Sequence, residues 1–328
     1  MKYLTTSINS SNMTPKPFVP LLTSMEDIIR RAREISSEGE PHKVAVAAAH
    51  DDAAIEAVVK SHSEGIATGV LFGDAAKINA LIEAHGGKPS DFRVIATEND
   101  ETSADLTAQT VGSGEAHIIM KGILPTSKLL KSVLKQQYGL RRRGLLSHTA
   151  ILSPEKYPKL LGVTDGGMVI KPTFDQKIEM VRNSVLVLRA LGVEVPRVAV
   201  LSTIDYVVEA FKDTFEAAAL SKMAQRGQIK HCHIDGPMSF DTAIRPEAVE
   251  YQKLKSDVAG QADIALAGSI EEANVLAKSL TLFGGAAFAG VIVGAGAPIS
   301  LVSRADNAFN KLASIALAVV LAHFLKER

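Results

Sequence analysis

Two short segments of this sequence combine hydroxyl groups with a basic residue directly after a predicted strand. In LVSRADN (301–307), a predicted strand ends at Ser303, Arg304 follows it, and a helix is predicted over 307–324. Ligands of α/β proteins bind at the carboxyl ends of strands, and helix N-terminal amides together with an arginine suit a phosphate group. We therefore predict an anion site at Ser303 and Arg304. The alternative is an arginine on the surface and a serine that only caps the next helix.

The segment MKGILPTSKLLK (120–131) has a similar arrangement. Lys121 and Gly122 follow a predicted strand, and Thr126 opens the next helix, so backbone amides and a hydroxyl meet at one turn. The spacing G-x-x-x-x-G-K-[ST] of a nucleotide-binding P-loop is absent. The turn therefore suits a simple anion, or it is an ordinary connection with a capping threonine.

Two segments in the second half allow weaker interpretations. HCHID (231–235) would put two histidines on one face of a strand, but no second Cys/His cluster completes a zinc set, so we predict no metal site. Cys232, placed in the middle of a strand predicted over 228–235, is expected to be a buried and inert thiol. Asp-Gly-Pro at 235–237 is a turn sequence that could shape a cleft wall or only reverse the chain.

The overall composition limits the classes of function. The 328 residues suffice for two domains of about 150 residues each. Lys plus Arg equals Asp plus Glu at 36 each, whereas nucleic-acid-binding proteins usually carry a basic excess. A single cysteine fits a reducing compartment, and the N-terminus lacks the apolar core of a signal peptide. The apolar run 312–322 is about half of the ~20 residues that cross a bilayer. We expect a cytoplasmic protein that binds neither nucleic acid nor membrane.

The periodicity of apolar residues predicts strands and helices that alternate along most of the chain, as in a parallel α/β sheet. Residues 1–23 are predicted to be a loose arm, and the irregular stretch Leu140–Asp165 is predicted to hold a domain boundary. Strands are predicted over 43–49, 67–73, 92–97, 116–120, 197–202, 228–235, 262–268, 287–296 and 298–303, and helices over 51–62, 75–85, 101–112, 126–136, 174–192, 214–227, 270–283 and 307–324.

Nine motifs in a common order resemble the phosphate acetyl/butyryltransferase family, most of all its butyryl-transferring members, over about residues 40–325. Each motif alone is weak, but their shared order argues strongly against chance. The motifs are MKG (120–122) with Thr126, SH (147–148), TDGGMVIKP (164–172), EAAALSKMAQRGQI (216–229), DGPMSFDTAI (235–244), SDVAGQADI (256–264), EEANVLAK (271–278), GAGAPI (294–299) and SRADN (303–307).

The resemblance implies two α/β domains around a cleft, similar to the isocitrate and isopropylmalate dehydrogenases. The C-terminal segment would return to the first domain, so that 1–143 plus 297–328 form one domain and 144–296 form the other. It also implies a homodimer that uses coenzyme A as a substrate, with no tightly bound cofactor and no metal.

The implied site has three parts. Ser303 and Arg304 would hold the phosphoryl group and the reacting carbonyl, and Asp306 is the nearest carboxylate to accept a thiol proton. The residues implied for substrate and phosphate binding are Lys121, Gly122, Thr126, Lys131 and Ser147, and those implied for coenzyme A are Gly236, Pro237, Asn274 and Lys278. Three features depart from the family pattern. Acetyl-transferring relatives carry a carboxylate base where Asn310 stands, the family has a glycine where Ala273 stands, and GSIEEAN (268–274) lacks the usual Pro-Asp/Glu run.

The implied activity moves a short-chain acyl group, butyryl or acetyl, between coenzyme A and inorganic phosphate by direct attack of the thiol on an acyl phosphate. Two alternatives stay open: a homologue that binds coenzyme A or acyl phosphate without activity, and a dehydrogenase of the same fold. A dehydrogenase would need clustered aspartates for a metal and a cofactor loop, and the Gly-x-Gly pairs at 112–114 and 294–296 precede predicted strands instead of helices. The acyl chain stays open because one methylene contributes only ~1 kcal/mol in a pocket.

Overall fold

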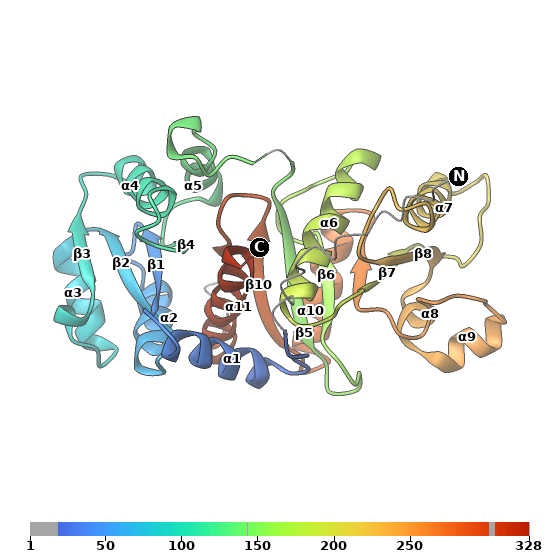
Figure 1. Cartoon of the computed structure of the whole chain (residues 1–328), viewed down its shortest axis with the longest axis horizontal. Helices are drawn as coiled ribbons and strands as arrows, with labels where there is room; N and C mark the ends of the chain where they lie inside the picture. Colours follow the sequence, from blue (N-terminus) through green and yellow to red (C-terminus); the bar gives the residue numbers. More distant parts are fainter. Residues whose placement is uncertain (1–18, 143, 302–305, 328) are drawn as a thin grey trace, which may run out of the picture.

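The computed structural model describes residues 19–142, 144–301 and 306–327, and these form an elongated α/β molecule (Figure 1). One mixed sheet runs along the molecule in the strand order β3-β2-β1-β4-β11-β10-β5-β6-β9-β7-β8. The strands are β1 (His42–Ala47), β2 (Ala67–Gly73), β3 (Arg93–Ala96), β4 (Ile118–Lys121), β5 (Ser147–Ser153), β6 (Leu161–Thr164), β7 (Arg197–Leu201), β8 (His233–Met238), β9 (Ile264–Leu266), β10 (Ala287–Val293) and β11 (Ile299–Ser300).

Helices cover both faces of this sheet. They are α1 (Met25–Ser37), α2 (Asp52–Ser63), α3 (Ala75–Ala84), α4 (Asp100–Gly112), α5 (Thr126–Val133), α6 (Phe174–Ala190), α7 (Lys212–Gln225), α8 (Phe240–Ile244), α9 (Pro246–Gln252), α10 (Ile270–Leu282) and α11 (Ala308–Lys326), with short 3-10 turns at Pro89–Asp91 and Gln136–Tyr138.

Strand β1 shows why the first half was predictable from sequence. Its side chains alternate between two apolar layers: Val44 and Val46 pack with α2 and α11, whereas Ala45 and Ala47 pack with α4 and α5. A strand buried on both faces is apolar throughout. The strands β3, β2, β1, β4 and β11 run parallel to one another, so their carboxyl ends lie at one edge of the sheet.

The centre of the sheet is antiparallel. β10 pairs antiparallel with both β11 and β5, and β5 pairs antiparallel with β6. β11 in turn pairs with β4, with Ile299 opposite Ile119. The C-terminal segment therefore lies beside the first half of the chain, and the sheet continues without a break from one half to the other.

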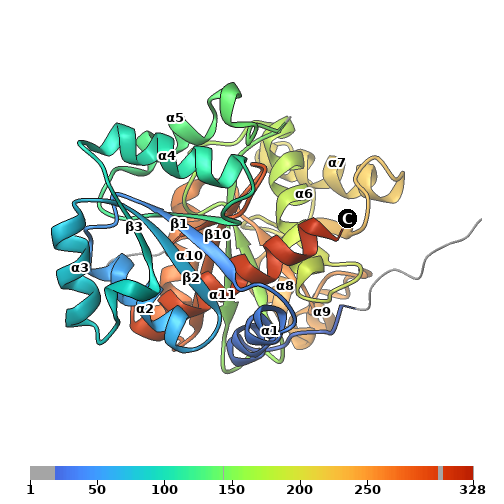
Figure 2. The same cartoon turned by 60° about the vertical axis from the view of Figure 1, so that its left-hand side comes forward.

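Helix α11 fills the middle of the molecule next to α1 (Figure 2). It is the one helix among the described residues that is long and apolar enough to cross a membrane by composition. However, 67% of its apolar window is buried inside the protein, against α1, α2 and β10. Its apolar sequence is thus that of a helix surrounded by protein on most sides.

Several elements differ from the sequence-based predictions. Helix α1 was not predicted, although Ser24 caps its N-terminus by accepting a hydrogen bond from the backbone of Asp27. Strands β5 and β6 form a hairpin inside the stretch that was predicted to be irregular. Strand β8 begins at His233, because His231 has a positive φ of 64° that breaks the extended run, so Cys232 precedes the strand. Asp-Gly-Pro at 235–237 lies within β8 and does not reverse the chain.

Candidate functional site

A cavity of about 910 Å³ opens on the face of the sheet that α10 covers. Its size is within the range of small-molecule sites. Strands β5, β6 and β10 form its floor, and α10 forms one wall. Another wall is formed by Leu301, Asp306, Asn307 and Asn310. The lining residues used below are His148, Gly166, Gly167, Asn274, Lys278, Phe288, Leu301, Asp306 and Asn310.

This cavity brings together three of the residues that the sequence singled out. Asn274 and Lys278 come from α10, and Asp306 comes from the segment before α11. Ser303 and Arg304 lie outside the described residues, in the short stretch between Leu301 and Asp306, both of which line the cavity. Lys278 is exposed at the surface and can offer its ammonium group to an anion in the cavity.

The alternation of strand β5 decides which of its side chains reach the cavity. His148 and Ala150 point to the α10 side and line it. Ser147 points to the α6 side, where it is 0% exposed and its hydroxyl accepts a hydrogen bond of 2.8 Å from Asn183 Nδ2. The serine that was predicted to bind phosphate is therefore enclosed between β5 and α6, and its neighbour in sequence is the residue that faces the cavity.

The turn after β6 is held tightly between β5 and α10. The Asp165 carboxylate accepts hydrogen bonds from the backbone N–H groups of His148, Gly167 and Met168, at 2.8, 2.7 and 2.7 Å. A Cβ on Gly166 would lie 3.2 Å from the backbone nitrogen of Asn274, and one on Gly167 would lie 3.2 Å from the His148 ring. The two glycines therefore allow the turn to contact both walls of the cavity closely.

His148 is the titratable side chain buried most deeply in the wall of the cavity. It is 4% exposed, and neither ring nitrogen has a hydrogen-bond partner among the described residues. Burial lowers the pKa of His148 below its usual value, and the Asp165 carboxylate opposes that shift. The ring is therefore neutral at pH 7 and keeps a basic nitrogen.

No role was predicted for His148. The Ser-His pair is part of one family motif, and phosphate binding was predicted for Ser147 alone. The period of two along a strand separates the two side chains, but only the packing of α10 and α6 shows which face carries the cavity.

Asn310 connects α11 to the floor of the cavity. It is 5% exposed, and its Oδ1 accepts a hydrogen bond of 3.1 Å from the backbone N–H of Phe288. Its own backbone N–H is bound by Asn307, the N-cap of α11, at 2.8 Å. A carboxamide has no basic site at neutral pH, so this side chain positions the helix and cannot accept a thiol proton.

The Lys121 turn leaves the sheet at the same edge as Leu301, because β4 and β11 are parallel neighbours. Gly122 packs directly against the end of β1, where its N–H donates to the carbonyl of Ala47 at 2.7 Å. A Cβ at Gly122 would lie 2.0 Å from the Ala48 carbonyl oxygen, which explains the glycine. Lys121 Nζ donates to the Gly122 carbonyl at 3.3 Å.

The other predicted phosphate and coenzyme A residues lie farther away in the fold. Thr126 opens α5 and is half-buried, and Lys131 is exposed in the last turn of the same helix. Gly236 and Pro237 lie on β8, at the opposite end of the sheet from β3, and Gly236 is packed against the Val200 carbonyl. None of these four residues is in the described lining of the cavity.

No group of three or more His, Cys, Asp or Glu side chains that could hold a metal ion occurs in the part of the chain that the structure describes. Cys232 is a free, buried cysteine, and burial raises the pKa of its thiol to about 11. A thiol with that pKa is almost entirely protonated at neutral pH and is a poor nucleophile.

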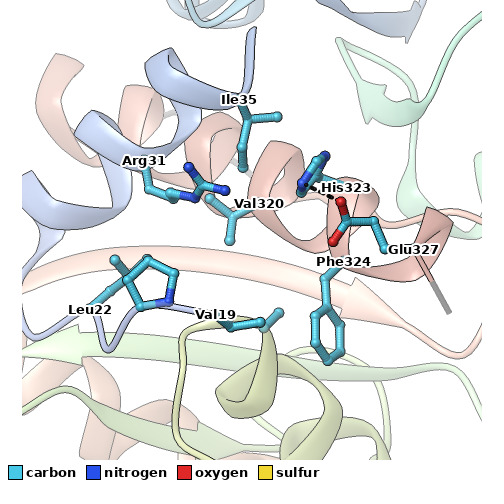
Figure 3. Close-up of a pocket in the computed structure, with 10 residues that line it drawn as sticks. Val19, Leu22, Arg31, Ile35, Val320, His323, Phe324 and Glu327 are labelled. Atoms are coloured by element: carbon cyan, nitrogen blue, oxygen red, sulfur yellow. Dashed lines mark ion pairs between the residues drawn. The ribbon is translucent and has the colours of Figure 1, made fainter. Parts of the chain in front are cut away.

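A second hollow lies between α1 and α11 (Figure 3), but its volume is only about 30 Å³. Val320 and Phe324 of α11 face Ile35 and Leu22 across it, and His323 pairs with Glu327 at 3.2 Å. This volume holds about one water molecule, so the hollow is a packing defect between helices and no substrate site.

A family model and similar curated proteins found by sequence comparison indicate the same family. The family model "Phosphate acetyl/butaryl transferase" matches residues 101–319. A phosphate butyryltransferase of Clostridium beijerinckii is 38% identical over 91% of this chain and 98% of its own length. A phosphate acetyltransferase of Thermotoga maritima is also 38% identical, over 91% of this chain and 99% of its own length.

Solved structures agree with the sequence comparison. A branched-chain phosphotransacylase from Enterococcus faecalis has a TM-score of 0.76 at 28% identity, and it covers 86% of this chain and 99% of its own. A 4-hydroxythreonine-4-phosphate dehydrogenase from Klebsiella pneumoniae has a TM-score of 0.52 at 14% identity over 86% of this chain and 100% of its own, which shows a shared fold alone. The predicted α/β fold related to dehydrogenases is confirmed.

Proposed function

Because this chain belongs to the phosphate acetyl/butyryltransferase family, we propose that it moves a short-chain acyl group between coenzyme A and inorganic phosphate. It is a phosphate acyltransferase, and the observation that supports the finer proposal is the cavity that gathers Asn274, Lys278 and Asp306. In the proposed reaction the sulfur of coenzyme A attacks the carbonyl of an acyl phosphate, and phosphate leaves.

In the proposed site, the departing phosphate and the phosphates of coenzyme A are bound by different cations. Arg304, with the Ser303 hydroxyl, offsets the charge on the departing phosphate, because a fixed cation in a cleft stabilises developing charge strongly. Lys278 meets the phosphates of coenzyme A at the mouth of the cavity. Asn274 also fixes the wall, since its Nδ2 donates to the Gly166 carbonyl at 3.1 Å.

The remaining predicted residues keep indirect roles in the proposal. Lys121, Gly122 and Thr126 shape the turn that leaves the sheet beside Leu301, and Lys131 adds a positive charge to that side of the molecule. Gly236 and Pro237 form part of the more distant wall for coenzyme A. No tightly bound cofactor or metal enters the proposed reaction.

Ionisation of the coenzyme A thiol has only a moderate free-energy cost. A thiol with a pKa near ~8.5 is only a few per cent ionised at neutral pH, so forming the thiolate costs roughly 2 kcal/mol. A positioned base typically accelerates such a step by about 10²–10⁴-fold. Asp306 is half-buried directly before the N-cap of α11 and is one candidate for that base.

We also propose that the protein is a cytoplasmic homodimer. The end of α10 exposes large apolar side chains, with Leu282 at 74% and Phe283 at 90% exposure, which an interface would cover. Light scattering coupled to size-exclusion chromatography tests this proposal. A mass near 70 kDa, twice the 34.9 kDa of the chain, supports it, and a mass of one chain contradicts it.

One assay separates the proposed activity from its alternatives. The protein is mixed with phosphate and a series of acyl-CoA thioesters from acetyl to pentanoyl, and free thiol is followed with a chromogenic reagent. We expect thiol release that depends on phosphate. Binding of acyl-CoA without thiol release would favour an inactive homologue, and reduction of a nicotinamide cofactor without acyl-CoA would favour a dehydrogenase.

A further inference from the structure

The imidazole of His148 lies in the wall of the cavity, and both of its ring nitrogens are buried without a hydrogen bond from the described residues. Buried polar groups in folded proteins nearly always have a partner, and each exception calls for an explanation. An unpaired ring that faces a cavity is explained when the partner arrives with the ligand. The feature therefore points to a ligand group that can donate or accept one proton.

The ring is held in place from several sides. Its backbone N–H is bound by Asp165, and a Cβ on either Gly167 or Gly290 would come within 3.2 Å of the ring. The aromatic ring of Phe288 lies at a centroid distance of 6.5 Å. This packing fixes the imidazole without using its nitrogens, as a group that must meet a substrate requires.

We infer that His148 is the proton acceptor for the thiol of coenzyme A, an inference that rests on the activity proposed above. A ring nitrogen takes the S–H proton as the sulfur–carbonyl bond forms, and the bond from the carbonyl carbon to the phosphate oxygen then breaks. In the reverse direction the imidazolium returns the proton to the departing sulfur. After the transfer, the imidazolium gives its proton to the released phosphate or to solvent.

The other polar groups of the cavity fit this role less well. The Asn310 amide is not basic, and its Oδ1 is already bound to Phe288. Asp306 is half-buried directly before the N-cap of α11, so solvent reaches its carboxylate. His148 is neutral at pH 7 because burial lowers its pKa.

Within the part of the chain that the structure describes, few charged side chains face His148. Asp165 from the turn after β6 is the one that acts on its pKa. Glu271 and Lys278 from α10 and Asp306 before α11 share the cavity, and β10 contributes the uncharged Phe288. Protonation of His148 would therefore be visible as a separate ionisation in the pH dependence of the reaction.

The experiment measures kcat/KM for coenzyme A between pH 5 and 9, with butyryl phosphate as the acyl donor. His148→Gln is compared with wild-type enzyme and with His62→Gln, a matched control at an exposed histidine of α2 whose side chain is 40% exposed. We expect His148→Gln to lower kcat/KM by about 10²–10³-fold and to remove the acidic limb of the profile. KM for butyryl phosphate should change less than threefold, and His62→Gln should stay within twofold of wild type.

A second variant separates chemistry from folding. Adding free imidazole to His148→Ala should raise the activity of this variant at least tenfold. The melting temperature of every variant is measured to confirm that it is folded. The inference is overturned if His148→Gln keeps the acidic limb, or if the loss is not restored by imidazole in a folded His148→Ala. A wild-type enzyme that transfers no acyl group from any donor would instead overturn the proposed activity, and with it this assignment.

Discussion

The carboxylate of Asp165 accepts a hydrogen bond of 2.8 Å from the backbone N–H of His148, and this contact joins strand β5 to the turn that closes the cavity against α10. The same carboxylate binds the N–H groups of Gly167 and Met168 on the far side of the turn. One buried side chain thus sets the position of both the imidazole and the glycine turn. Hydrogen bonds to an ionised carboxylate are about twice as strong as neutral ones.

Asp165→Asn should therefore weaken both stability and turnover. The amide keeps one acceptor oxygen but places an NH2 group where a backbone N–H now donates, which leaves buried donors unpaired at a cost of about 1–3 kcal/mol. Thermal unfolding and turnover with saturating substrates measure the two effects. The exposed Asp175→Asn in the first turn of α6 is the control. An unchanged melting temperature for Asp165→Asn would show that the turn does not depend on this carboxylate.

Lys278→Ala tests the proposed placement of coenzyme A. Losing a cation that meets a phosphate at an exposed site should raise KM for coenzyme A about tenfold, while kcat changes less than twofold, because the ammonium binds substrate and transition state equally. Steady-state kinetics at fixed ionic strength provide both constants. Lys156→Ala, in the exposed connection between β5 and β6, should leave KM unchanged. Equal effects of the two variants would place coenzyme A elsewhere.

Arg304→Ala tests the phosphate part of the site. Removing the cation that stabilises the leaving phosphate should lower kcat by at least ~100-fold with the fold intact. Circular dichroism confirms the fold, and the acyl transfer assay gives kcat. Activity within threefold of wild type would mean that the phosphate group is bound by other residues.

His42 predicts how stability depends on pH. Its ring lies 5.0 and 6.3 Å from the rings of His117 and His323, and burial, together with these neighbours and Lys326, lowers its pKa from 6.5 to about 4. Between pH ~6.5 and ~4 the unfolded chain binds more protons at His42 than the folded protein. The free energy of unfolding should therefore fall as the pH falls through that range.

The expected loss from His42 between pH 7 and 5 is on the order of 1–2 kcal/mol. Urea unfolding at the two pH values measures it. His42→Gln removes the titrating group and should flatten the dependence by that amount, whereas His62→Gln, at an exposed position, should not. The same slope in His42→Gln and in the wild type would assign the acid sensitivity to other groups.

The first half of the fold was predictable because strands such as β1 are apolar on both faces and are separated by capped helices. The β5–β6 hairpin was not, since β5 begins with the polar pair Ser147–His148 and β6 ends with Thr164, and the burial of these residues depends on α6 and α10. Asp235–Pro237 has the composition of a turn, yet register with β7 keeps it in a strand.

For the site, the sequence motifs singled out Asn274, Lys278 and Asp306, and all three line one cavity, while their roles stay a prediction. His148 escaped notice because a histidine between a serine and a threonine has no pattern of its own. Its importance follows from two observations that only packing provides: the ring lies in the wall of a cavity, and its buried nitrogens have no hydrogen-bond partner among the described residues. The roles of Ser303 and Arg304 still rest on their motif.

The most direct test of the central claim follows both products of the transfer in one reaction. Wild-type protein is incubated with butyryl-CoA and inorganic phosphate, acyl phosphate is quantified by phosphorus NMR, and free coenzyme A is quantified by its thiol. We expect acyl phosphate and thiol to appear in equal amounts and both to require phosphate. Thiol released without acyl phosphate, or no thiol release with any acyl-CoA from two to five carbons, would contradict it.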